Sequence, residues 1–298
     1  MQYRTLGKTG FEVSGVVYGG IVSTDVGQQD SDRSVSWSID RGVNYFDVAP
    51  TYGDAEEKLG NSLKPYRKDV YLACKTTERS REGALKEINR SLELLHTDWF
   101  DVFQLHSLTT REDVEVAFGP GGIMELLREL KEKGAIRKLG FSAHSEYAAL
   151  EALSLYDFDT VLFPTSYQLD MGEGISRDLK AQKAKRGFGF LGMKSLIERA
   201  WLNDQEKSDC GYPKSWCKPF AKEEGAYRVA GMKYALTLGA DVLVPPGNFE
   251  CYSFMVDHVD EVYGAPLSQQ ELDMLRLRYQ QVKDHPFFLK NNGGWHAA

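Results

Sequence analysis

Residues 44–60, NYFDVAPTYGDAEEKLG, begin as an apolar run and continue, after Pro50, into a segment with helical spacing of its apolar residues. A strand followed by a helix is the repeating unit of α/β proteins. Asp47 closes the strand-like part and Tyr52 follows it. A side chain at the C-terminal end of a parallel strand points into the mouth of an α/β barrel, where catalytic groups gather. The stretch therefore predicts both a fold and the position of a site.

The same alternation extends over most of the 298 residues. Eight strand-like runs are present: VSGVVYGG, VNYFDVA, DVYLACKT, WFDVFQLH, AIRKLGFSA, TVLFPTSY, FGFLGMKS and DVLVPP. Helical patterns follow near 30–41, 54–64, 80–95, 122–134, 146–154, 176–186, 221–238 and 250–261. Eight strands, each followed by a helix, predict an α/β fold of the (β/α)8 TIM barrel type, and a barrel of about 250 residues plus insertions needs no second domain. We expect a single barrel domain over residues 1–298.

Segments outside this repeat lie at both ends and after the seventh strand. The opening MQYRTLGKTG predicts an N-terminal hairpin that turns at Lys8-Thr9-Gly10, and residues 268–283 predict an added C-terminal amphipathic helix. The loop 195–220 contains the large aromatic residues Trp201, Tyr212 and Trp216, and the tail contains Phe287, Phe288 and Trp295. Aromatic residues in such positions either line a substrate pocket or only fasten the segment to the barrel, and the sequence leaves both open.

Two further strand-like runs end in residues with acid–base chemistry. Lys75 closes DVYLACKTT and His106 closes DVFQLHS, as Asp47 closes the run before them. Each of these residues alone has an ordinary structural explanation, but they close consecutive runs one strand–helix unit apart. A tyrosine with an ordinary pKa of about 10 becomes a better acid beside a lysine cation, which a carboxylate can hold in place. Together with Tyr52 they predict a proton-donating site.

FDVAPTYGDAEEKLG, ACKT and QLHS resemble the signature segments of the aldo-keto reductases, and the resemblance covers nearly the whole chain, from RTLGKTG to VPPGN. It implies an NAD(P)-dependent oxidoreductase that transfers hydride between nicotinamide and an aldehyde, ketone or sugar carbonyl. In this reading Tyr52 donates the proton and Lys75 lowers its pKa. Asp47 pairs with Lys75, and His106 orients the carbonyl oxygen.

No GxGxxG motif follows a strand, as expected if the barrel itself binds the nucleotide. The resemblance implies which residues of the barrel would do so. They come from the Gly-Gly-Ile segment after the first strand, LGFSAHS, FPTSYQ, MKSL and PPGN, and from the segment beyond it. FPTSYQ departs from the family, with Ser166, Tyr167 and Gln168 where an asparagine and an aromatic ring usually stand. The candidate cofactor-binding residues are Gly20, Ile21, Asp47, Ser142, Ser166, Tyr167, Lys194, Pro246, Gly247, Asn248, Glu250 and His258.

The segment expected to hold the adenosine half lacks basic residues. From Tyr234 to Leu275 the chain has no lysine or arginine, whereas many relatives carry one after the eighth strand to hold the 2′-phosphate of NADPH. An acidic residue near the ribose, here Glu250, favours hydroxyl groups over a phosphate. We therefore expect NADH to be used at least as readily as NADPH.

Composition excludes several other classes. A net charge of −7 offers no basic surface for nucleic acid or anionic membranes, and no apolar stretch approaches the roughly 20 residues of a membrane helix. The N-terminus lacks the apolar core of a signal peptide, and four cysteines suit a reducing compartment, so we expect a cytoplasmic protein. Cysteine spacing matches no zinc motif, and HPFFLKNNGGWHAA lacks the cysteines of an iron–sulfur tail, so no metal site is expected.

Two alternatives to a reductase remain open. One is a redox-neutral sugar epimerase or lyase that keeps its nucleotide and recycles the hydride. The other is a non-catalytic, cofactor-binding regulatory subunit, against which the intact set of four residues argues. The sequence leaves the substrate, the direction of reaction and the oligomeric state undetermined.

Overall fold

The computed structural model describes residues 1–290 and contains a parallel sheet of eight strands. Its order is β12-β9-β8-β7-β6-β5-β4-β3. The strands are β3 (Tyr18–Gly19), β4 (Tyr45–Asp47), β5 (Tyr71–Thr76), β6 (Phe100–Leu108), β7 (Ile136–Ala143), β8 (Thr160–Pro164), β9 (Gly189–Met193) and β12 (Val242–Val244). The sheet closes because Val17 N donates to Leu243 O at 3.0 Å and Leu243 N donates to Gly15 O at 2.8 Å. The predicted barrel is confirmed.

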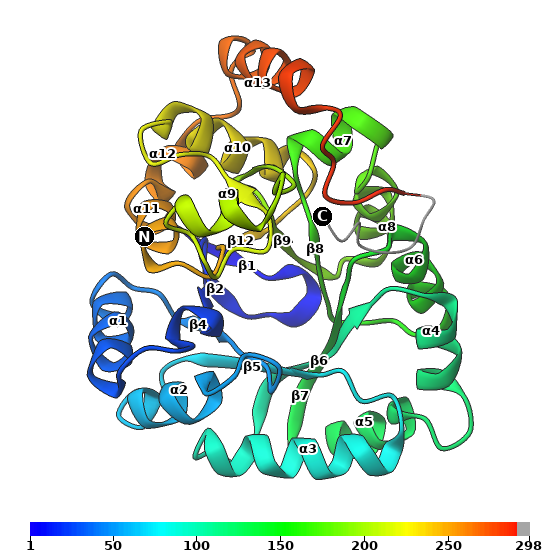
Figure 1. Cartoon of the computed structure of the whole chain (residues 1–298). Coiled ribbons are helices and arrows are strands. Elements are labelled where there is room, and N and C mark those ends of the chain that lie inside the picture. Colours follow the sequence, from blue (N-terminus) through cyan, green and yellow to red (C-terminus); the bar gives the residue numbers. More distant parts are fainter. Residues whose placement is uncertain (291–298) are drawn as a thin grey trace.

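Helices surround this barrel (Figure 1). Those that match the predicted helical patterns are α1 (Gln28–Asp40), α2 (Ala55–Leu63), α3 (Arg81–Leu94), α5 (Ile123–Glu132), α6 (Glu146–Leu155), α8 (Arg177–Arg186), α10 (Gly225–Thr237), α11 (Phe249–Asp257) and α13 (Gln269–Val282). Four short helices were not predicted: α4 (Arg111–Phe118), α7 (Tyr167–Glu173), α9 (Asp204–Asp209) and α12 (Val259–Gly264). They escape a periodicity argument because they span about two turns or fewer. None of the helices in residues 1–290 is long and apolar enough to cross a membrane.

The N-terminal hairpin forms as predicted and covers the end of the barrel where the strands begin. β1 (Tyr3–Thr5) pairs with β2 (Glu12–Ser14) in antiparallel register, and Lys8 N donates to Gly187 O at 2.6 Å, just before β9. Gly7 has φ 48°, and a Cβ there would lie 2.3 Å from Gly189 N. This close approach requires glycine, so the hairpin is fixed to the barrel and leaves the opposite end for a site.

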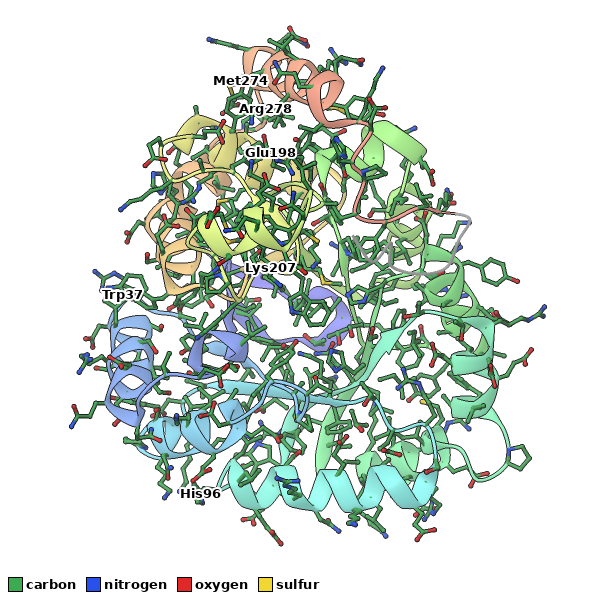
Figure 2. All side chains as sticks on the ribbon, in the orientation of Figure 1. Trp37, His96, Glu198, Lys207, Met274 and Arg278 are labelled. Carbon is green, nitrogen blue, oxygen red and sulfur yellow. The ribbon has the colours of Figure 1, made fainter. Side chains whose placement is uncertain are left out.

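The predicted C-terminal helix α13 is also confirmed, and ion pairs hold it against the rest of the structure. Ser268 and Glu271 form a capping box at its start. Arg278 contacts Glu198, and its Nη2 lies 2.5 Å from Glu224 Oε1; Arg278 and Glu198 are labelled in Figure 2. The chain then returns beside α7 (Figure 1). Helix α13 therefore sets the path of the residues that follow it.

Alternation along the strands separates two apolar layers. Tyr45, Ala73 and Val102, on three adjacent strands, belong to a small cluster that also includes hairpin residues Leu6 and Val13. Their neighbours in sequence pack instead in the large cluster shared with the helices. Because successive side chains of a strand point to opposite faces, the first set points into the barrel. The residues two positions further along each strand must point inward as well, nearer the mouth.

Asp101 joins β5 and β6 near their beginnings. Its carboxylate is 1% exposed and accepts from Arg67 Nη1 at 3.1 Å, Leu72 N at 2.9 Å and Arg137 Nη1 at 2.7 Å. The side chain of Arg67 is itself 8% exposed. A buried ion pair of this kind contributes little net stability, but the loss of one partner leaves a buried charge uncompensated.

We predict that Asp101→Asn lowers the free energy of unfolding by about 3 kcal/mol, because the Arg67 charge stays buried without its counter-ion. Urea denaturation of both proteins would measure the change. The matched control is Asp30→Asn, which removes an exposed Asp–Arg pair with Arg33 and should cost no more than about 1 kcal/mol. Equal losses in the two variants would contradict a special role for the buried pair.

Candidate active site

The strand alternation brings the predicted catalytic residues together. Asp47, Lys75 and Gln104 each stand two positions beyond an inward-facing apolar residue, on β4, β5 and β6. The register pairs Lys75 with Gln104, and Asp47 with Ala73, two residues before Lys75 on the same face, so the three side chains are neighbours inside the barrel. His106 follows on β6, on the same face as Gln104. The structure thus places these side chains at the strand ends, as the sequence predicted.

Asp47 and Lys75 form a buried ion pair. The Lys75 ammonium donates to Asp47 Oδ1, with side-chain exposures of 1% for Lys75 and 3% for Asp47. Gln104 Nε2 donates to the other carboxylate oxygen, Oδ2, at 3.0 Å. Burial opposes the charge on Lys75, but Asp47 and Tyr52 together outweigh it and raise the Lys75 pKa. The lysine is therefore a cation at neutral pH.

Tyr52 and His106 complete the predicted set. The Lys75 Nζ atom lies 5.1 Å from the centroid of the Tyr52 ring, and the rings of Tyr52 and His106 meet edge to face with centroids 5.9 Å apart. Thr51 Oγ1 lies 3.4 Å from His106 Nδ1. All four predicted catalytic residues line one cleft. The cation and both rings therefore surround one small volume, in which a carbonyl oxygen could contact them together.

The net pKa shift of Tyr52 differs from the expectation. Burial raises its pKa, and this outweighs the opposing effect of the Lys75 cation. Asp47 also raises the pKa, since its negative charge offsets part of that cation. Lys75 does act in the predicted direction, but the result is a phenol with a pKa above its ordinary value. Such a phenol stays protonated at neutral pH, as a proton donor must.

Two neutral histidines stand beside it. Burial, followed by the Lys75 cation, holds the pKa of His106 well below its ordinary value. Burial also lowers the pKa of His144 to about 3, helped by the Lys194 cation. His144 Nδ1 lies 3.0 Å from Ser107 Oγ, so the pair shares a hydrogen bond. At neutral pH both imidazoles are uncharged, so each can donate or accept a hydrogen bond but carries no counter-charge for a substrate.

The cleft encloses about 780 Å³ of space, part of which is open solvent. Its walls come from the ends of the strands and from the loop after β9. Besides the four predicted catalytic residues they comprise Gly19, Ile21, Ser142, His144, Leu162, Met193, Lys194, Ile197, Lys214, Ser215, Trp216, Val244, Pro245, Pro246 and Gly247.

Half of the predicted nucleotide-binding residues lie in these walls. They are Ile21, Asp47, Ser142, Lys194, Pro246 and Gly247. Gly20 and Asn248 are chain neighbours of wall residues, and Asn248 Nδ2 is a buried donor without a partner among residues 1–290. Ser142 Oγ accepts from Ser107 N at 2.8 Å, which leaves its hydroxyl hydrogen for a ligand. The strand ends thus present donors on both sides of the cleft.

Ser166 and Tyr167 lie elsewhere, which corrects that part of the prediction. Ser166 is the N-cap of α7, so the chain has already turned away from the barrel mouth. The Tyr167 ring stacks on Phe220, and its hydroxyl donates to Glu198 O at 3.2 Å. The next residue, Gln168, donates its amide to His285 O at 3.0 Å. This segment therefore supports the C-terminal chain and does not reach the cleft.

Glu250, in the first turn of α11, and His258, the C-cap of that helix, are also outside the cleft walls. Glu250 forms a two-pronged ion pair with Arg228, at 2.6 and 3.1 Å, and Arg228 is fully buried. The His258 ring stacks on Phe254 and borders a different groove, next to α10 and α13. No local sequence pattern pairs Glu250 with Arg228, because Arg228 belongs to another helix.

The aromatic residues of the loop after β9 fill both predicted roles, since one lines the cleft and two fasten the loop to the barrel. Trp216 lines the cleft, whereas Trp201 is buried and donates to Ser215 O at 3.1 Å, and Tyr212 accepts from Arg228. Lys214 crosses to the opposite rim, where its ammonium donates to the carbonyls of Val22 and Thr24. Trp201 and Tyr212 thus fasten the loop, and Trp216 shapes the cleft.

The tail reaches the same region. The Phe288 ring stacks on His144 with centroids 5.2 Å apart, and Phe287 packs edge to face against Phe288. Trp295 lies outside the described residues. Phe288 therefore packs against a wall residue of the cleft, so the tail supports that wall.

Sequence reasoning missed Gln104, His144 and Lys214. Gln104 stands two residues before His106 on β6, so the alternation alone points it to the same face, and His144 directly follows β7, two residues after Ser142. Lys214 gave no signal, because its position depends on the path of an irregular loop. No cluster of three potential metal-ligating side chains occurs within residues 1–290.

The sequence profile of the aldo/keto reductase family matches residues 17–208, which is more than half of the chain. The chain therefore belongs to the aldo/keto reductase family. The matched region contains all four predicted catalytic residues and ends within α9.

Individual relatives are distant. The aldo-keto reductase YhdN of Bacillus subtilis is 29% identical over 164 residues, covering 49% of this chain and 48% of the relative. The probable aldo-keto reductase 1 of Glycine max is 25% identical over 90% of this chain and 86% of the relative. The chain spans about half the length of the first of these. Among solved structures, an aldo-keto reductase from Klebsiella pneumoniae in complex with NADPH superimposes with a TM-score of 0.67 at 19% identity, covering 97% of this chain and 100% of the other. This supports the fold.

We predict that the protein loses stability as the pH falls below about 6.5, because His144 must then charge on unfolding but stays neutral in the fold down to about pH 3. The folded state binds fewer protons than the unfolded state in this range, so each pH unit removes up to about 1.4 kcal/mol per histidine. His144→Asn should flatten the dependence of unfolding free energy on pH between about pH 6.5 and 5. An unchanged slope in this variant would contradict the assignment.

Proposed function

We propose that this protein is an NAD(P)H-dependent carbonyl reductase, or an alcohol dehydrogenase in the reverse direction, acting on a small aldehyde, ketone or sugar. One observation carries the proposal. The ammonium of Lys75, fixed by Asp47, lies against the Tyr52 ring, and His106 meets the same ring at the base of a single cleft. Membership in the aldo/keto reductase family supports it.

The chemistry required of these residues is a proton transfer and a hydrogen bond. NAD(P)H, when bound, would supply the hydride that the carbonyl carbon receives. Tyr52 gives its hydroxyl proton to the carbonyl oxygen, which then becomes the alcohol, and the resulting tyrosinate faces the Lys75 cation. His106, neutral at working pH, donates a hydrogen bond that holds the oxygen toward Tyr52. Solvent returns one proton to Tyr52, so one hydride and one proton are consumed per turnover.

The cleft contains groups suited to a dinucleotide. Ser142 offers a hydroxyl donor for the carboxamide, and Asn248 offers a buried amide donor next to Gly247. A Cβ at Gly247 would lie 2.9 Å from Ile21 and 3.0 Å from Lys214 O, so the backbone there is open to close approach only because it is glycine. Lys194 and Lys214 supply positive charge for the pyrophosphate. We propose that Gly20, Ile21, Ser142, Lys194, Pro246, Gly247 and Asn248 hold the nucleotide.

The argument for NADH changes in one respect. Glu250 is neutralised by Arg228, so it repels a 2′-phosphate less than an unpaired carboxylate would. At the same time, Arg228 is fully buried and its donors are used by Glu250, Tyr212 and Phe220 O. No arginine or lysine in the segment 234–275 replaces it. We therefore propose that NADH binds at least as tightly as NADPH.

Tyr52→Phe tests the reductase assignment. We expect carbonyl reduction to fall by at least about a hundredfold, because the proton donor is removed while the ring remains. The dissociation constant for NAD(P)H should change by no more than about twofold. Oxidation of NADH or NADPH with a panel of aldehydes, ketones and sugars, followed by nicotinamide absorbance, measures the first effect. Near-normal turnover in the variant would refute the role of Tyr52, and wild-type protein that consumes no nucleotide with any of these carbonyls would refute the reductase.

Fluorescence titration with NADH and NADPH tests the preference. In the unmodified protein the two dissociation constants should be similar or favour NADH, since the 2′-phosphate gains no charge-assisted contact worth roughly 1.5–3 kcal/mol. Glu250→Gln frees part of the Arg228 donor set and removes a negative charge, so binding should shift toward NADPH. Glu261→Gln, on α12, removes the same charge without touching the Arg228–Glu250 pair and serves as the control. A clear NADPH preference in the unmodified protein overturns this proposal.

A further inference from the structure

We propose that Gln104 is a positioning residue of the active site, which fixes the Asp47 carboxylate and through it places the Lys75 ammonium against Tyr52. It is not one of the four residues that the proposed chemistry uses, and the inference rests on the proposed function. It stands on β6, two positions before His106, and its side chain is fully buried.

The contact geometry supports this role. Asp47 has two oxygens, and each has one side-chain partner: Oδ1 accepts from Lys75 and Oδ2 accepts from Gln104 Nε2 at 3.0 Å. A carboxylate held at one oxygen can rotate about its Cβ–Cγ bond, whereas one held at both has a fixed plane. In the strand register Gln104 is the direct neighbour of Lys75, on the side away from Asp47. Gln104 therefore reaches past the lysine strand to hold the carboxylate.

Fixing Asp47 matters because Lys75 interacts with two groups, Asp47 and Tyr52, that have different roles. Its attraction to Asp47 keeps it charged, but only its approach to Tyr52 stabilises the tyrosinate that forms during reduction. If Oδ2 lost its donor, the carboxylate would be free to turn both oxygens toward the Lys75 ammonium, which would draw the ammonium away from Tyr52. With Gln104 in place, one oxygen of the Asp47 carboxylate accepts from a neutral donor and the other accepts from the cation.

Burying the Gln104 amide at this position is otherwise unfavourable for stability. Gln104 Oε1 has no hydrogen-bond partner among residues 1–290, although it is buried, and an unsatisfied buried acceptor costs about 1–3 kcal/mol. A leucine of similar size would avoid that cost. The amide is explained if its other end, the Nε2 donor on Asp47, is what the site requires.

The test uses Gln104→Leu and Gln104→Glu in the full chain. Gln104→Leu removes the donor, and we expect kcat to fall about tenfold to a hundredfold, with KM for the nucleotide within about twofold of the wild type. Gln104→Glu keeps a donor only while the introduced carboxyl is protonated, and burial beside Asp47 raises the pKa of that carboxyl. Its kcat should therefore be close to that of the wild type near about pH 5 and fall as the pH rises to about 8. The wild type should show no such fall, because Tyr52 stays protonated and His106 stays neutral.

Gln168→Leu is the matched control, since it also removes a buried amide that donates to a distant partner, here the C-terminal backbone. It should lower the melting temperature and leave the shape of the pH–rate profile as in the wild type. A purely structural Gln104 would behave in the same way. Wild-type kcat in Gln104→Leu, or equal losses at both pH values in Gln104→Glu, would overturn the proposal.

Melting temperatures separate this result from a failure of the proposed function. If the wild type reduces no carbonyl, the function fails, yet the contact remains testable. The introduced carboxyl of Gln104→Glu binds a proton more tightly in the fold than in the unfolded chain, so its stability should fall as the pH rises from about 5 to 8. The quantity to follow is the difference in melting temperature between Gln104→Glu and Gln104→Leu at each pH. If this difference stays constant over the range, residue 104 does not contact Asp47, and the inference is overturned without any measurement of turnover.

Discussion

The buried ion pair between Asp47 and Lys75 is the constraint on which the site depends. Neither side chain is more than 3% exposed, and taking two such charges out of water costs several kcal/mol per ion unless every remaining polar contact is made well. The barrel meets this condition because the parallel strands β4, β5 and β6 point Asp47, Lys75 and Gln104 inward, where Lys75 and Gln104 each donate to the Asp47 carboxylate. The hairpin at the other end of the barrel keeps water from reaching the pair from below. A lysine fixed in this way remains charged, and its field acts on the Tyr52 ring.

Strand alternation explains how far the sequence could predict the structure. A period of two tells which face each residue occupies, so the positions of Asp47, Lys75 and His106 follow from their runs, and so does the barrel from the count of those runs. Residues after the strands do not obey this rule. Ser166 and Tyr167 were expected in the cleft, but α7 begins at Tyr167 and turns both away. Glu250 pairs with an arginine on a different helix, a contact that no local pattern encodes.

The cleft differs in charge from the rest of the molecule. The whole chain carries a net charge of −7, yet the charged side chains in the described cleft walls are one carboxylate, Asp47, and three lysines, Lys75, Lys194 and Lys214. Asp47 and Lys75 offset each other, and Asp25 and Asp54 act on Lys214 from outside the walls. Lysines at the mouth of a cleft attract anions. Association of an anionic ligand should accordingly slow as salt is added.

The Lys214 contact has a kinetic consequence. The loop after β9 is joined to the opposite rim through the Val22 and Thr24 carbonyls, and Lys214 O lies close to Gly247. An elongated ligand that passes between Gly247 and this loop cannot enter while those bonds are made, so the loop has to lift first and close afterwards. Breaking the two Lys214 bonds is one of the steps that such an exchange requires, along with any movement of the contacts that Trp201 and Tyr212 make. A substitution of Lys214 should therefore change the speed of exchange as well as the charge that the cleft offers.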